Sequence, residues 1–263
     1  MKKTKSAAIS LLLALAMLLV SSCSTIEAVE LSAEYERTAT ETGSVSEDFI
    51  TKLTALSFKM FSEITTEDED KANLLFSPLS AAVCIAMITN GADGETLAEL
   101  EELFGMDIET LNKSIYAYVA SLYTSDDCKL SLSNSIWVRN TRITVKETFL
   151  QTNADWYGAD AYSAPFDDST VDDINKWCRD NTDGLINKII DEIPQDAVAY
   201  LINSLLFDAK WMSEYDDDDM IENATFTNYD GTTSEVTLMD SIESQYLTNG
   251  NATGVMKYYS GYS

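Results

Sequence analysis

The chain has 263 residues, of which 45% are hydrophobic and 10% aromatic, and its formal net charge is −27. This composition is too apolar for a disordered chain, and its excess of acidic residues argues against binding to nucleic acid and against electrostatic docking on an anionic membrane. The sequence contains no histidine, which excludes a Ser-His-Asp or Cys-His hydrolase and a histidine-ligated zinc site.

The N-terminus has the order of an export signal. Three lysines precede an apolar run over residues 7–20, which leads through two serines to Cys23. The run is short for a membrane-spanning helix but typical of a secretory signal. Val20-Ser21-Ser22-Cys23 resembles a bacterial lipobox, which implies cleavage before Cys23 and a lipid on its sulfur. The alternative is an ordinary signal peptide in which Cys23 is incidental. We expect a lipoprotein signal peptide over 1–22 and an exported protein, held on the outer face of the bacterial membrane by this lipid alone.

Residues 23–45 are rich in Ser, Thr, Glu and Ala and carry little hydrophobic pattern. This composition predicts a flexible, lipid-anchored linker. The globular domain is expected to begin at Ser46, because its hydroxyl can cap a helix that has Glu47 and Asp48 in the first turn.

Hydrophobic periodicity predicts helices mainly in the first half of the domain and strands mainly in the second. Pro78, in the segment Ser77-Pro78-Leu79-Ser80, is expected at the first position of a helix that is apolar nearly all round, so we expect this helix to be buried. The expected helices cover residues 46–66, 81–90, 95–104, 108–123 and 146–157, and a last one runs from a cap at Ser169 through 180. The expected strands cover residues 73–76, 130–138, 159–164 and 197–207, followed by short strands with turns at Asp230-Gly231 and Asn249-Gly250. This mixture predicts an α+β fold.

Three cysteines follow the leader, Cys84, Cys128 and Cys178. They are far apart and odd in number, so they predict neither a disulfide framework nor a metal knuckle, and small buried hydrophobes are the simpler interpretation. The acidic groups at Asp167-Asp168 and at 216–219 could bind calcium or act as paired carboxylates, but no glycine-spaced loop surrounds them and a solvated turn is the simpler interpretation. We expect no metal and no cofactor.

Four segments then carry a family resemblance. Residues 73–80 (NLLFSPLS), with Gly91-Ala92 after them, are similar to the serpin stretch from the first short strand through the second helix. Ile174-Asn175 with 182–186 (TDGLI) resembles the family's IN…T.GKI, and 203–211 (NSLLFDAKW) resembles NA.YFKG.W. Residues 255–261 (VMKYYSG) resemble VELPYKG at three of seven positions. Because the motifs stand in the family's order, the chain resembles a bacterial lipoprotein-type serpin from about Ser46 to its last residue.

The resemblance implies a serpin fold, with helices packed around a large mixed sheet A and smaller sheets. It also implies an inhibitor of serine or cysteine proteases rather than an enzyme. In that mechanism an exposed reactive loop is cleaved and inserts into the sheet as a new strand. A non-inhibitory serpin that serves as a binding or structural module at the cell surface is the alternative. An enzyme built on the acidic groups is a third class, with less support.

The resemblance also assigns site residues. Ser77, Ser80 and Asn203 would pair beneath the centre of the sheet, in the part called the shutter, and Trp211 would lie at its top, in the breach. A plain helix cap and plain core are the simpler alternatives for these positions. The family's C-terminal third, with the reactive-centre bond, would lie beyond the last residue. We therefore expect residues 46–263 to be a partial serpin domain that is inactive alone. The target protease cannot be identified from this sequence.

Overall fold

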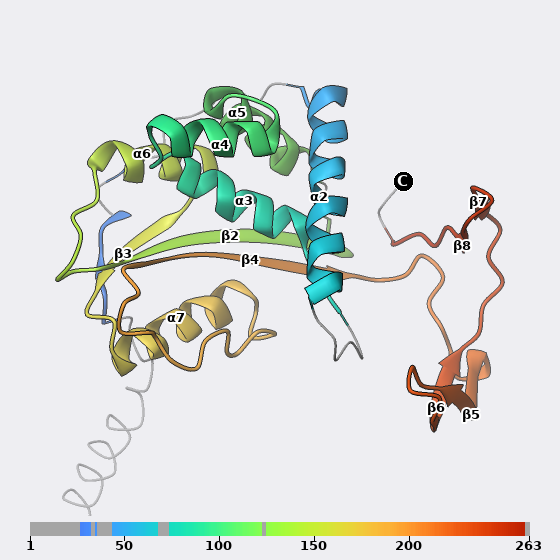
Figure 1. Cartoon of the computed structure of the whole chain (residues 1–263). Helices are drawn as coiled ribbons and strands as arrows, with labels where there is room; N and C mark the ends of the chain where they lie inside the picture. Colours follow the sequence, from blue (N-terminus) through green and yellow to red (C-terminus); the bar gives the residue numbers. More distant parts are fainter. Residues whose placement is uncertain (1–26, 33–34, 36–43, 68–73, 123–124, 261–263) are drawn as a thin grey trace, which may run out of the picture.

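The computed structural model describes residues 27–32, 35, 44–67, 74–122 and 125–260. A sheet with the strand order β1-β3-β2-β4 runs through the domain (Figure 1). Its strands are β1 (Val29–Glu30), β2 (Cys128–Arg139), β3 (Asp160–Ala164) and β4 (Ala199–Ala209). Strand β2 is parallel to β3 and antiparallel to β4. The expected signal peptide and Cys23 lie outside the described residues.

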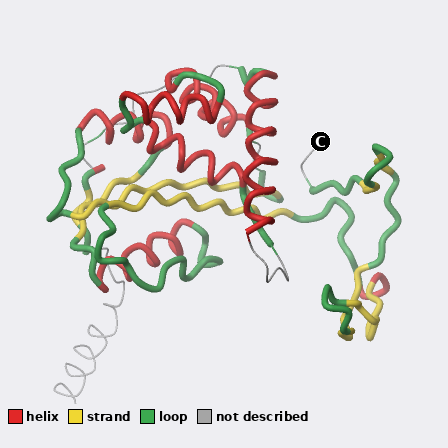
Figure 2. Tube along the Cα trace, viewed as in Figure 1, coloured by secondary structure: helices red, strands yellow, loops and turns green. Residues whose placement is uncertain are grey.

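Helices cover both faces of this sheet (Figures 1 and 2). Helix α7 (Asp168–Asn181) lies on one face, and α3 packs on β4 from the other. The helices on the side of α3 are α2 (Glu47–Glu67), α3 (Pro78–Thr89), α4 (Gly94–Phe104), α5 (Ile108–Ser121) and α6 (Glu147–Tyr157). The expected helices and the α+β class are therefore confirmed, and none of the described helices is long and apolar enough to span a membrane.

The alternation of side chains along β2 divides the core in two. Ile136 and Val138 point into a cluster with residues of α2, α3, α5 and α6. Trp137 points the other way and stacks on Tyr162, with 4.3 Å between the ring centroids, in a second cluster that includes Trp177 of α7. Both faces of the sheet are thus covered, in keeping with the long apolar run of β4.

Local capping signals set the helix ends. The hydroxyl of Ser46 accepts a hydrogen bond from the Phe49 backbone N–H at 3.1 Å, as predicted. Helix α7 instead begins after Asp167, whose carboxylate accepts from the Ser169 N–H and hydroxyl at 3.0 and 2.7 Å. The expected cap at Ser169 was wrong, because the carboxylate two residues earlier is the better acceptor and occupies the N-terminal end of the helix.

Two other expectations differ from the structure. Residues 74–76 form no strand, and Leu75 is 99% exposed. A strand needs a partner for its main-chain groups, and no described strand pairs with this segment. Part of the expected linker over 23–45 is also not a tether, because β1 lies within it and pairs with β3.

After β4 the chain forms two hairpins that lie apart from the main sheet (Figure 1). The strands are β5 (Met220–Thr227), β6 (Thr233–Met239), β7 (Tyr246–Thr248) and β8 (Thr253–Val255). The connecting turns contain Gly231 at φ 82° and Gly250 at φ 89°, a left-handed backbone that glycine adopts without strain. The turn predictions at these two positions are confirmed.

Candidate functional site

The long strand β4 has one paired edge and one open edge. It pairs with β2 from Ala199 to Ala209, and no described strand lies on its other side. Its faces are covered, because Leu201 packs with the cluster of α3 and Ile202 with that of α7. A strand with covered faces and a free row of main-chain groups is suited to accept another strand. The open edge of β4 is therefore the candidate functional site.

Asn203 lies in the middle of β4. Its Nδ2 donates to Oδ1 of Asn134, its opposite residue on β2, at 2.8 Å, and Asn134 Nδ2 donates to the Tyr157 carbonyl at 2.7 Å. Asn203 Oδ1 and Ser204 Oγ are buried and make no hydrogen bond to any described residue. Buried polar atoms without a partner are rare, and two of the five found among the described residues belong to β4.

Ser77 and Ser80 lie at the start of α3. Ser77 Oγ accepts from the Ser80 backbone N–H at 3.3 Å and so caps the helix. Neither hydroxyl bonds to Asn203, so the expected pairing of these three residues is not formed in the described structure. The partner of Asn203 is Asn134, which the motifs did not include. The cap of the simpler interpretation is present, and a shutter role for the three residues stays a prediction.

Cys84 lies one helical turn after Ser80 and faces β4. Its Sγ lies 3.9 Å from the Leu201 carbonyl oxygen, and burial raises the pKa of the thiol. Cys128 and Cys178 are buried and free, as the interpretation of the cysteines as small hydrophobes predicted. Burial also raises the pKa of Cys178.

Trp211 follows the end of β4 and lies in an aromatic cluster. Its indole stacks on Tyr259, with 4.3 Å between the ring centroids and 13° between the planes. The ammonium of Lys257 lies 5.5 Å from the Trp211 ring and 4.3 Å from the Tyr215 ring, and 2.7 Å from a Glu243 carboxylate oxygen. This hydrogen bond raises the pKa of Lys257 and lowers that of Glu243. The cluster holds Trp211 in place, and its breach role stays a prediction.

Two residues of the IN…T.G motif anchor the loop between α7 and β4. Asn175 Oδ1 accepts from the backbone N–H groups of Ile189 and Ile190 at 2.8 and 3.2 Å, and Nδ2 donates to the Ile190 carbonyl at 2.9 Å. Thr182 Oγ1 donates to the Cys178 carbonyl at 2.8 Å and accepts from the Ile186 N–H at 3.1 Å. The motif was noted in the sequence, but this role was not expected.

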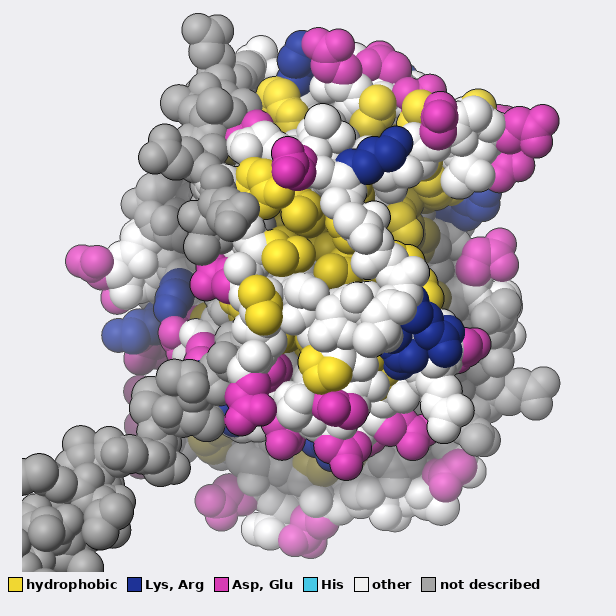
Figure 3. Space-filling view, turned by 90° about the vertical axis from the view of Figure 1, so that its left-hand side faces the viewer, with side chains coloured by type: hydrophobic (Ala, Val, Ile, Leu, Met, Phe, Trp, Pro, Cys, Tyr) yellow, Lys and Arg dark blue, Asp and Glu magenta, His cyan; other side chains and the backbone are white. Residues whose placement is uncertain are grey.

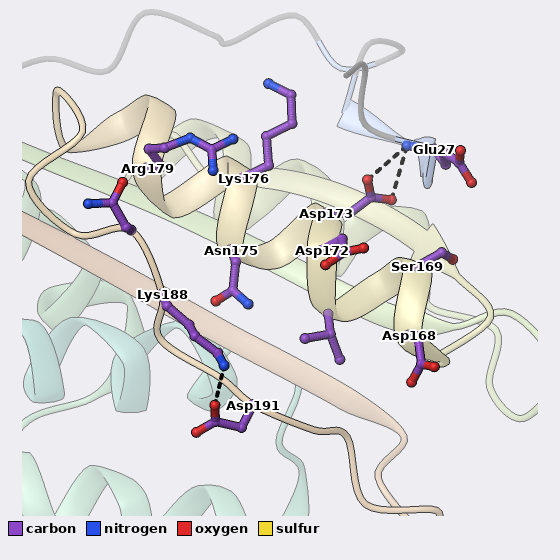
Figure 4. A pocket seen from close by; sticks show the side chains of 12 residues that line it. Glu27, Asp168, Ser169, Asp172, Asp173, Asn175, Lys176, Arg179, Lys188 and Asp191 are labelled. Carbon is purple, nitrogen blue, oxygen red and sulfur yellow. Dashed lines mark hydrogen bonds and ion pairs between the residues drawn. The ribbon is translucent and has the colours of Figure 1, made fainter. Parts of the chain in front are cut away.

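A surface hollow of about 690 Å³ lies between α7 and this loop (Figure 4). Asp173 points toward Glu27 at one end, and Lys188 forms an ion pair with Asp191 at the other. The described residues contain no cluster of side chains suited to a metal ion. Asp173 and the Lys188–Asp191 pair of this hollow thus bind parts of the chain to one another.

Acidic side chains surround the face shown in Figure 3, with hydrophobic side chains gathered near its middle. The acidic groups outnumber Lys and Arg on this face, in keeping with the net charge of −27. An acidic surface of this kind favours solubility, and this face is not suited to binding the phosphate groups of a nucleic acid.

Comparison with known proteins identifies the fold. The family model described as "Serpin (serine protease inhibitor)" matches residues 51–259. A serpin-like protein of Methanosarcina acetivorans is 28% identical over 213 residues, which is 77% of this chain and 48% of that protein. Human neuroserpin is 30% identical over 169 residues, or 61% of this chain and 40% of neuroserpin.

A solved structure of a serpin has the same fold as this chain. The native state of the thermophilic serpin tengpin superposes with a TM-score of 0.84 at 37% identity, and the match covers 90% of this chain and 61% of tengpin. The match therefore spans half or less of the length of these two curated relatives. It spans about three fifths of the tengpin structure.

Proposed function

The chain belongs to the serpin family, and on this premise we propose that a serpin carrying these residues inhibits a serine or cysteine protease and is not an enzyme. The proposal is supported by the family match over residues 51–259 and by β4, a long strand with covered faces whose second edge pairs with no described strand. A cleaved reactive loop would insert there as an additional strand. The alternative is a non-inhibitory binding or structural role, and the test described below distinguishes it from protease inhibition.

The proposed roles of the site residues follow from their places. Asn203, with Asn134, holds the middle of β4 against β2, and Ser77 with Ser80 fixes the helix beneath it. Trp211 lies where the chain leaves β4. An inserting strand would pass the unsatisfied Asn203 Oδ1, and it could supply the missing hydrogen bond.

A protein of full serpin length that carries these residues is expected to trap a serine or cysteine protease covalently. Incubation with a panel of such proteases, followed by a denaturing gel, should show a band at the summed mass of inhibitor and protease. Residues 24–263 alone should give no such band, because the resemblance places the reactive bond outside them. Cleavage of the full-length protein by every protease tested, with no covalent band, would favour the non-inhibitory alternative.

We further propose that the protein is exported and anchored outside the bacterial membrane by a lipid on Cys23. The support is the sequence alone, in which a charged start, a short apolar run and small residues precede this cysteine. No other membrane contact is proposed, because an acidic surface is repelled by anionic lipid.

Labelled fatty acid is expected to enter the wild-type protein in a bacterial host and to be lost in Cys23→Ser. Cys84→Ser is the matched control, since it removes the same group from a position inside the domain, and it should retain the label. Equal labelling of Cys23→Ser and wild type would show that Cys23 is not the lipid site.

A further inference from the structure

The first described residues, 27–31, form an N-terminal strap along one edge of the sheet. Val29 and Glu30 pair antiparallel with Ser163 and Tyr162 of β3. The Leu31 N–H then donates to the Ala161 carbonyl at 2.7 Å. The strap thus covers the edge of β3, whose main-chain groups would otherwise be exposed.

The strap is also bound to α7 through one carboxylate (Figure 4). Asp173 accepts from the Glu27 N–H, at 3.0 Å to each oxygen, and from the Ala28 N–H at 2.8 Å. Asp173 is only 5% exposed, and none of the described Lys or Arg side chains forms an ion pair with it. A buried carboxylate is costly unless hydrogen-bonded, so Asp173 depends on the strap for its partners.

The side chains of the strap reach both parts of the core. Ala28 packs against the cluster that contains Trp177 of α7. Leu31 packs against the cluster on the opposite face of the sheet. A segment that crosses the sheet edge in this way links α7 to the sheet and to the helices beyond it.

We propose that the strap is a latch that holds α7 against the sheet. Releasing it would leave Asp173 buried without a partner, and the N-terminal half of α7, which carries Asp173, would loosen. Asn175 and Thr182 bind the following loop to α7, and this loop leads into β4. The N-terminal segment therefore controls how firmly the loop before β4 is held. This proposal stands independently of the inhibitory function.

Hydrogen exchange in the natural full-length protein tests the latch. Asp173→Asn removes the charge of the acceptor, and Ala28→Pro removes the Ala28 N–H donor without any substitution in α7. In each variant the amides of α7 should exchange about tenfold faster or more. This is the factor expected when a hydrogen bond to a charged group is lost. Asp172→Asn, the neighbouring exposed acid on the same helix, is the matched control and should stay within about twofold of wild type.

The double variant distinguishes a shared contact from two separate effects. If both changes release the same latch, Asp173→Asn with Ala28→Pro should exchange no faster than the faster single variant. The amides of α4, which lies on the other side of the sheet, should keep their wild-type rates. Unchanged α7 exchange in Ala28→Pro would overturn the proposal, and so would an equal acceleration in α4. Ala28→Pro keeps the test decisive if Asp173→Asn fails to fold.

Discussion

Residues 24–263, expressed alone, are expected to form oligomers or aggregates instead of running as a monomer. The open edge of β4 presents unpaired main-chain groups, and such edges template association between chains. Large apolar side chains are exposed on β4 and in the segment between β6 and β7, including Phe207 at 41% and Ile242 at 100%. The high net negative charge opposes association but acts over the whole surface, whereas the edge is a local template.

Size exclusion with light scattering measures this association. Phe207→Lys places a charge on the open-edged strand and should raise the monomer fraction several-fold, because a lysine on an edge strand opposes pairing. Tyr229→Lys is the matched control, since it adds the same charge at an exposed residue between β5 and β6 and should change little. A wild-type monomer with one cooperative unfolding transition would contradict the prediction.

Asn175→Ala is expected to destabilise the natural full-length protein by about 2–4 kcal/mol. The change removes three hydrogen bonds, and it leaves two backbone N–H groups and one carbonyl of the loop without their partner. Each lost bond contributes about 1 kcal/mol, and unsatisfied groups that stay buried add to this. Urea unfolding, analysed at constant m-value, gives the difference in free energy.

Asn187→Ala provides the control within the same loop. Asn187 is exposed, so its replacement should lie within about 0.5 kcal/mol of wild type. If Asn175→Ala proved as mild as Asn187→Ala, the anchoring of the loop by the motif would be of no energetic importance. If both variants were strongly destabilised, the loop would depend on its sequence generally instead of on this side chain.

The features that the sequence predicted well are those that depend on neighbouring residues. The cap at Ser46, the proline start at Pro78 and the glycine turns at 231 and 250 are local signals, and each lies where it was expected. The alternation in β2 likewise follows from the period of a strand. The motifs of the family, read in order, then supplied the topology.

The features that the sequence did not predict depend on partners far along the chain. Strand β1 has two residues in a polar segment, and it exists because β3 and Asp173 bind it from more than a hundred residues away. The apolar residues 74–76 lack such a partner and form no strand. The pairing of Asn203 with Asn134 depends on the register between β4 and β2, which no local pattern contains.

The strap also sets how the domain would be presented at a cell surface. If Cys23 carries the proposed lipid, only three residues separate it from Glu27, which is bound to α7. Four steps along an extended chain reach about 14 Å, so the lipid would hold the domain close to the bilayer with its β1 edge inward. Strand β4 is at the opposite edge of the sheet. The β4 side of the described sheet would then face away from the bilayer.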